Sequence, residues 1–273
     1  MMWTLSTPGD GVAVATYSNP EMNYFTLEAA QELGQLIESW HTDRSLRAIV
    51  LCGDGRSTGF ITHFSVETLE QIASDPDAAR DSAEVSRGYH ALLDGLNRLP
   101  QAVIAAMNGD TMGGGFELSL ACDIRIGQNG DHRYGLPEAR LGIMPGGGGT
   151  QRLPRLIGPA RALELVLRGR VVDPVEALRL GMVHELADDA VERATRVATE
   201  IAALPSTSVA NIKTAVYQGT DTTLAEGLDI ESDSFQNTML SDDARERMRA
   251  YLAVPEPDRR AWLESDGRSP TGE

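Results

Sequence analysis

The segment NGDTMGGGFELSLACDIRIG, residues 108–127, is the most informative part of the sequence. Its three glycines, Gly113 to Gly115, directly precede the apolar, helix-forming run FELSLA. Glycines at a helix N-terminus leave backbone N–H groups open, at the end where the helix dipole concentrates partial positive charge. The segment therefore predicts a backbone site for a negatively charged oxygen, such as the oxyanion of a reacting carbonyl group.

Two glutamates accompany this glycine turn. Glu117 lies one turn into the expected helix as the only charged residue of its apolar run, so burial should raise the pKa of its carboxyl group. Glu138 follows Pro137 within YGLPEARLGIMPGGGGTQRL, residues 134–153, just before a second glycine cluster. Either glutamate alone could simply be an acid that stabilises the first turn of a helix. Together with the two glycine clusters, the pair indicates acid–base chemistry on a polarised carbonyl.

Composition and charge exclude several classes of function. The 273-residue chain is 41% hydrophobic and carries a formal charge of −16, which argues against binding to nucleic acids or anionic membranes. Its two cysteines, Cys52 and Cys122, lie in apolar segments and are expected to be buried thiols in a reducing compartment. The N-terminus has no cationic signal region, and no run approaches the roughly 20 apolar residues of a membrane span. We therefore expect a cytoplasmic protein.

Strands and helices alternate over the first two thirds of the chain, a pattern typical of a layered α/β fold. The patterns predict strands at 12–17, 47–52, 102–107 and 123–126, and helices at 26–40, 66–72 and 78–99, with another helix around Glu117. From residue 161 onward they predict almost only helices, at 161–168, 174–180, 188–203, 206–218 and 222–251. We expect two regions, an α/β body at 1–205 and a helical region at 206–273 whose apolar residues pack on the body or on a neighbouring subunit.

Other motifs point to no further chemistry. The loop GDGRSTG, residues 53–59, follows a strand as a dinucleotide-binding loop would, but a broken helical stretch of about 40 residues before the next strand favours a simple turn. No histidines or cysteines have metal-ligand spacing, so no metal site is expected. His63 is a reserve candidate because it follows this loop. The sequence contains no P-loop, no GxSxG elbow and no EF-hand.

With these motifs, the sequence resembles the crotonase, or enoyl-CoA hydratase/isomerase, superfamily. The similarity runs from NPEMN at 19–23 through RAIVLCGDGRSTGF at 47–60 and both glycine segments to SDDARERM at 241–248. The blocks GGGFELSLACD and PEARLGIMPGGGGTQRL are the most specific. The resemblance implies a crotonase-like spiral of ββα turns in residues 1–205, which would hold the acyl-CoA site. It also implies a C-terminal helical trimerisation region and a homotrimer or homohexamer.

The resemblance also implies a reaction, the hydration of a trans-2-enoyl-CoA to a 3-hydroxyacyl-CoA in fatty acid metabolism. Glu117 and Glu138 occupy the positions of two glutamates that act on one water, and Gly146 that of a glycine that positions this water. Phe60 and Gly114 occupy the positions of the two oxyanion-hole N–H donors. The implied substrate contacts are Thr58, Phe60 and Gly114. No separate cofactor is implied, because CoA is part of the substrate.

The sequence departs from the family pattern at two places. Phe60 stands where alanine is usual, and we expect its side chain to border the acyl group and reshape the pocket. Lysines often found near the CoA phosphates are missing, which leaves Arg56, Arg259 and Arg260 as candidates. Two alternatives to a hydratase stay open at this point: an isomerase or other enolate-forming acyl-CoA enzyme that uses one glutamate, and a non-catalytic acyl-CoA-binding protein.

Overall fold

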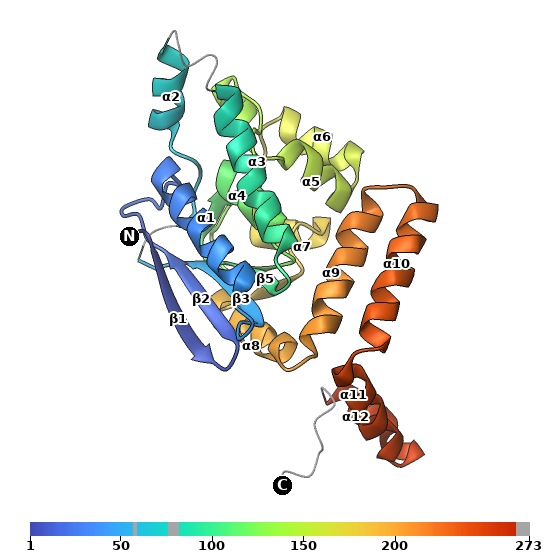
Figure 1. The fold of residues 1–273 in the computed structure, drawn as a ribbon. Coiled ribbons are helices and arrows are strands. Elements are labelled where there is room, and N and C mark those ends of the chain that lie inside the picture. Colours follow the sequence, from blue (N-terminus) through green and yellow to red (C-terminus); the bar gives the residue numbers. More distant parts are fainter. Residues whose placement is uncertain (57–58, 76–81, 266–273) are drawn as a thin grey trace.

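Two fully buried strands, β3 (Ala48–Gly53) and β5 (Ala102–Met107), form the centre of a six-stranded sheet in the computed structural model, which describes residues 1–56, 59–75 and 82–265 (Figure 1). The strand order is β1-β2-β3-β5-β7-β10, and only β1 runs antiparallel to its neighbour. The outer strands are β1 (Trp3–Gly9), β2 (Val12–Tyr17), β7 (Ile124–Gln128) and β10 (Glu185–Ala187). Continuous apolar runs such as AIVLCG and AVIAAM are typical of parallel strands covered on both faces.

A second, four-stranded sheet has the order β4-β6-β8-β9. Its strands are β4 (Gly59–Ile61), β6 (Asp110–Met112), β8 (Tyr134–Gly135) and β9 (Val171–Val172). Successive turns of the chain place one strand in each sheet and then add helical structure, as in β3–β4, β5–β6 and β7–β8. The spiral of ββα turns implied by the resemblance is therefore confirmed. The sequence did not predict β1, whose residues do not alternate in burial, or the strands of this small sheet, which are too short to show periodicity.

The helices of the body follow these strands in chain order. They are α1 (Leu27–Thr42), α2 (Val66–Ser74), α3 (Ser82–Arg98), α4 (Gly113–Ala121), the 3-10 helix η1 (Glu138–Leu141), α5 (Gly149–Ile157), α6 (Pro159–Leu167), α7 (Pro174–Leu180) and α8 (Ala190–Ala202). Alternate residues of β3 face two hydrophobic clusters: Ile49 and Leu51 face the small sheet, and Val50 and Cys52 face α8. Cys52 and Cys122 are buried free thiols, as predicted.

The C-terminal helices lie at one side of the body, with α11 and α12 farthest from it (Figure 1). They are α9 (Ser206–Thr220), α10 (Leu224–Met239), α11 (Asp242–Ala253), the 3-10 helix η2 (Glu256–Asp258) and α12 (Arg259–Glu264). Helices α9 and α10 lie side by side as a hairpin. The helix predicted at 222–251 is in fact two helices, because Ser241 ends the continuity and its hydroxyl accepts a hydrogen bond from the Ala244 N–H as the cap of α11.

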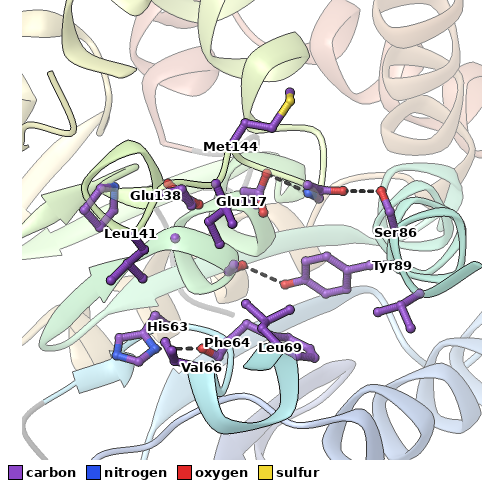
Figure 2. A pocket seen from close by; sticks show the side chains of 17 residues that line it. His63, Phe64, Val66, Leu69, Ser86, Tyr89, Glu117, Glu138, Leu141 and Met144 are labelled. Carbon is purple, nitrogen blue, oxygen red and sulfur yellow. Dashed lines mark hydrogen bonds between the residues drawn. The ribbon is translucent and has the colours of Figure 1, made fainter. Parts of the chain in front are cut away.

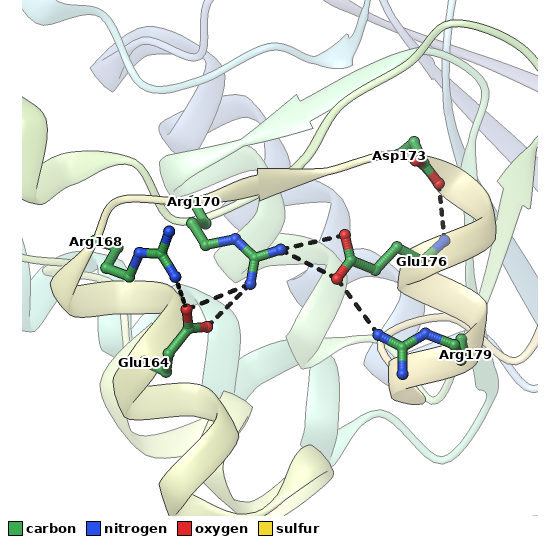
Figure 3. A network of polar contacts seen from close by, with 6 residues as sticks. All are labelled: Glu164, Arg168, Arg170, Asp173, Glu176 and Arg179. Carbon is green, nitrogen blue, oxygen red and sulfur yellow. Dashed lines mark hydrogen bonds and ion pairs between the residues drawn. The ribbon is translucent and has the colours of Figure 1, made fainter.

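An ion-pair network joins α6 and α7 around β9 (Figure 3). The Arg170 guanidinium contacts Glu164 of α6 at 3.0 Å and Glu176 of α7 at 3.1 Å. Nearby, the Arg140 Nε donates to the Gly169 carbonyl at 2.7 Å, which ties η1 to the same region. The Arg140 bond thus connects the short helix on which Glu138 lies to the segment next to this network.

Candidate active site

A cavity of about 310 Å³ lies between α2, α3, the start of α4 and the segment from η1 to the second glycine cluster (Figure 2). Its wall is largely apolar, with contributions from Phe64, Val66, Leu69, Leu141, Ile143 and Met144. Glu117 and Glu138 both line it, as the sequence predicted. No lysine or arginine lines it within the described residues. Such a cavity fits an uncharged apolar group brought next to two carboxyl groups.

Glu117 projects from α4, whose residues are all buried, and is only 3% exposed. Its Oε1 accepts hydrogen bonds from the backbone N–H groups of Gly147, at 2.8 Å, and Gly149, at 2.7 Å. Burial raises the pKa of this carboxyl group, while these two N–H bonds act in the opposite direction because they stabilise the charged form. The second glycine cluster therefore forms a backbone cradle for the Glu117 carboxylate. This cradle was not foreseen in the sequence.

Glu138 begins η1, and its carboxyl group has a different environment. The Oε2 atom is buried without a hydrogen-bond partner in the described part of the chain. Burial, together with the nearby charge of Glu117, raises the pKa of Glu138 to about 7. Glu138 is therefore suited to carry a proton near neutral pH. The pKa of Glu117 is also raised overall, but its two N–H bonds favour the charged form that can accept a proton.

The glycine turn at the start of α4 adopts a conformation that requires its glycines. Gly113 has a φ of +48°, and a Cβ on Gly115 would lie 2.0 Å from the Ile61 carbonyl oxygen. Met112 precedes the helix without a side-chain cap, so the first N–H groups of α4 receive no capping acceptor from it. A Cβ on Gly114 would lie 3.1 Å from the Phe64 Cβ and 3.6 Å from the Phe64 nitrogen. Gly114 and Phe64 are thus neighbours at the cavity.

The prediction that the Phe60 side chain borders the acyl group is wrong. The Phe60 side chain is fully buried in the core and does not line the cavity, because it belongs to β4. Phe64, four residues later, lines the cavity instead. Phe25 pairs with the backbone on either side of Phe64: its N–H donates to the His63 carbonyl and its carbonyl accepts from the Ser65 N–H, both at 2.8 Å. This pairing turns the Phe64 N–H away from Phe25. No described acceptor takes this N–H.

The other predicted residues have mixed outcomes. Gly146 lines the cavity, and its carbonyl accepts a hydrogen bond from the Ser86 hydroxyl at 2.7 Å. His63 also lines the cavity, with its ring stacked on Tyr24 at 4.4 Å between centroids. Thr58 lies outside the described residues. None of the three arginines considered for the CoA phosphates lines the cavity; they are Arg56, Arg259 and Arg260.

Two features are absent from residues 1–56, 59–75 and 82–265. No group of three or more histidine, cysteine, aspartate or glutamate side chains in these ranges could hold a metal ion. No helix in them is long and apolar enough to cross a membrane.

Comparisons with known proteins agree with this geometry. The family model described as enoyl-CoA hydratase/isomerase matches residues 7–259. A Bacillus subtilis (strain 168) protein named "Probable enoyl-CoA hydratase" is 34% identical over 249 residues, which cover 90% of this chain and 94% of that protein. The fatty acid oxidation complex subunit alpha of Shewanella halifaxensis is 29% identical over 93% of this chain, but only 41% of that longer protein is matched. The crystal structure of an enoyl-CoA hydratase from Bacillus anthracis superposes with a TM-score of 0.85 at 30% identity, covering 92% of this chain and 96% of that chain. This chain belongs to the enoyl-CoA hydratase/isomerase family.

Proposed function

We propose that the protein hydrates a 2-enoyl-CoA thioester to the corresponding 3-hydroxyacyl-CoA. The observation that carries the proposal is that two carboxyl groups line one apolar cavity, beside the neighbouring backbones of Phe64 and Gly114. Glu117 is buried and accepts two backbone N–H bonds, whereas Glu138 is half-buried and its Oε2 has no hydrogen-bond partner among the described residues. An isomerase needs one such carboxyl group, whereas hydration uses both, one as base and one as acid.

The oxyanion hole is assigned to the backbone N–H groups of Phe64 and Gly114. Both residues line the cavity, and Gly114 lies in the first turn of α4, where the helix dipole favours negative charge. A thioester oxygen held between them would gain about 3 kcal/mol from each donor as an enolate forms. This assignment replaces Phe60 by Phe64 and keeps Gly114 as predicted.

The two glutamates divide the proton transfers. Glu117, ionised and held by two N–H groups, takes a proton from water while the water oxygen forms a bond to the β-carbon of the enoyl group. The electrons of the double bond move onto the thioester oxygen. Glu138, protonated, then gives its proton to the α-carbon as the carbonyl reforms. The water oxygen thus becomes the hydroxyl group at the β-carbon. Glu117 then gives its proton to solvent and Glu138 takes one from solvent, so one water is added overall. We propose that Gly146 helps to position this water.

A panel assay tests the proposal. Purified protein is mixed with 2-enoyl-CoA esters of different lengths, and loss of the ultraviolet absorbance of the conjugated thioester is followed. We expect turnover of at least one ester, and Glu117→Gln and Glu138→Gln should each lower kcat by about 100-fold or more, the scale of a lost acid–base group. A protein that binds these esters without turning any of them over would refute the proposal, as would two glutamine variants with full activity.

The same assay run with 3-enoyl-CoA esters separates a hydratase from an isomerase. An isomerase would convert them to the conjugated 2-enoyl esters, so absorbance would rise, and only one of the two glutamine variants would lose activity. For the hydratase proposed here we expect the 2-enoyl esters to be the better substrates by kcat/KM.

A further inference from the structure

The glycine turn that carries the Gly114 donor receives one side-chain hydrogen bond from the described part of the chain. The buried Tyr89 of α3 donates its hydroxyl proton to the Gly114 carbonyl at 2.6 Å. No other described side chain is hydrogen-bonded to the backbone of Gly113, Gly114 or Gly115. Consecutive glycines have the largest backbone freedom to lose, and Met112 gives the turn no cap, so this bond replaces a restraint that the local sequence lacks.

The ring of the same tyrosine packs against the second glycine cluster. A Cβ on Gly147 would lie 2.5 Å from two ring carbons of Tyr89 and 2.6 Å from Oε2 of Glu117. Gly147 is therefore held between the Tyr89 ring and the Glu117 carboxylate that its N–H binds. Ser86, one helical turn before Tyr89, donates its hydroxyl to the carbonyl of the adjacent Gly146 at 2.7 Å. Figure 2 shows both side chains pointing from α3 toward the cavity.

We infer that Ser86 and Tyr89 are positioning residues that fasten the two glycine segments of the site from one face of α3. Tyr89 holds the turn that presents the Gly114 donor, and Ser86 holds the loop whose N–H groups bind Glu117. Residues three apart on a helix share a face, which is why one helix reaches both segments. The kinetic consequences rest on the proposed hydratase function, whereas the restraint on the backbone does not.

Tyr89→Phe tests the first half, because it keeps the ring against Gly147 and removes only the hydroxyl group. Loss of one hydrogen bond should speed hydrogen–deuterium exchange of the first-turn amides of α4 by about 5-fold. In turnover, kcat should fall by about 10-fold with KM changed less than about 2-fold, since a misplaced oxyanion donor acts on the transition state. Tyr17→Phe is a matched control, because this buried hydroxyl also donates to a backbone carbonyl, that of Tyr24, at 2.6 Å.

Ser86→Ala tests the second half. Once the Gly146 carbonyl has lost the hydrogen bond from Ser86, the amides of Gly147 and Gly149 should exchange faster, again by about 5-fold. Weaker N–H bonds to Glu117 also raise the pKa of its carboxyl group, so the acidic limb of the pH–rate profile should move to higher pH. The other groups that act on Glu117 are unchanged by this substitution: His90, Arg152, Tyr89 and Glu138. Ser39→Ala is the control, because its hydroxyl donates to the Leu36 carbonyl at the same 2.7 Å.

The outcomes separate this inference from the proposed function. Faster exchange confined to residues 113–118 in Tyr89→Phe and to 146–149 in Ser86→Ala would support it, even if the wild-type protein hydrated no ester. Unchanged exchange in both segments would overturn it, whatever the activity. Exchange that rose equally in the central strand β3 would also contradict it, because that result would indicate general loosening rather than local positioning.

Discussion

Glu138 combines a buried oxygen that has no hydrogen-bond partner among the described residues with a pKa raised from 4.5 to about 7. Because the folded state binds this proton more tightly than the unfolded state, ionising Glu138 destabilises the fold. The penalty is absent below about pH 4.5, grows up to about pH 7 and is constant above it. We predict that Glu138→Gln, though expected to be about 100-fold or more slower in turnover, is more stable than wild type by about 1 to 3 kcal/mol at pH 8 and equally stable near pH 4. Urea denaturation at both pH values measures this difference, and equal stability at pH 8 would contradict it.

Two phenylalanines, Phe60 and Phe64, should respond differently to truncation. Phe60→Ala removes a fully buried core ring and should cost about 3 kcal/mol or more of unfolding free energy. Phe64→Ala keeps the peptide N–H and enlarges the cavity, so bulkier enoyl groups should gain about 10-fold in relative kcat/KM over short ones. Denaturation and the ester panel measure the two effects. A selectivity change in Phe60→Ala but not in Phe64→Ala would show that Phe60, as expected from the sequence, borders the acyl group.

The site residues differ in how far the sequence could reveal them. Glu117 and Glu138 were predictable because each stands beside a glycine cluster, and glycines next to regular structure indicate close backbone approach. The cradle of Gly147 and Gly149 N–H groups was not, because it forms between segments 30 and 32 residues apart. Phe64 was missed because the glycine of STGF suggested Phe60, whereas strand β4 continues to Ile61 before the chain reaches the cavity. Ser65 caps the N-terminus of α2, so Phe64 lies directly before the point where this helix begins.

At the scale of elements, α9 is attached to the body through a buried ion pair. The Lys213 ammonium contacts Asp123 at 2.8 Å and donates to the Gln101 carbonyl at 2.7 Å. The other oxygen of Asp123 accepts the Tyr217 hydroxyl, also from α9. Lys213→Met leaves this aspartate buried without its cation and should cost about 3 kcal/mol, the scale for breaking a buried pair.

Urea denaturation of Lys213→Met measures this cost, and the double variant Lys213→Met/Asp123→Asn is the control. The double variant should be the more stable of the two, because it leaves no unpaired charge. A single variant as stable as wild type would show that the ion pair does not fasten α9.

Elements were predictable where their sequence pattern is long. The buried strands β3 and β5 and the helix α1 were found because their apolar runs or stripes span six residues or more. The strands of the small sheet have two or three residues each, and tertiary pairing rather than local propensity defines them. The assignment of the spiral therefore depended on family motifs and not on periodicity.

At the surface of the molecule, several large apolar side chains of the hairpin formed by α9 and α10 are exposed. Ile212, Val216, Leu224, Leu228 and Phe235 are between 51% and 79% exposed, whereas Val209 packs on the core of the body. Such a surface is typical of a subunit interface. We propose that it assembles the protein into a homotrimer or a pair of trimers.

Light scattering at micromolar concentration measures this assembly, with an expected mass of about three or six times 29.4 kDa. Phe235→Asp places a charge in the proposed interface and should shift the mass toward that of the monomer. A wild-type monomer under these conditions would contradict the proposal.

We propose that both glutamates act on one water across the enoyl double bond. Mass spectrometry and NMR of the product formed in oxygen-18-labelled heavy water test this mechanism. We expect one labelled oxygen at the β-carbon and one solvent deuteron at the α-carbon in the wild-type product, and formation of this product at least about 100-fold slower in Glu117→Gln and Glu138→Gln. A product with solvent deuterium but without labelled oxygen, or labelled product formed at the wild-type rate by either variant, would contradict it.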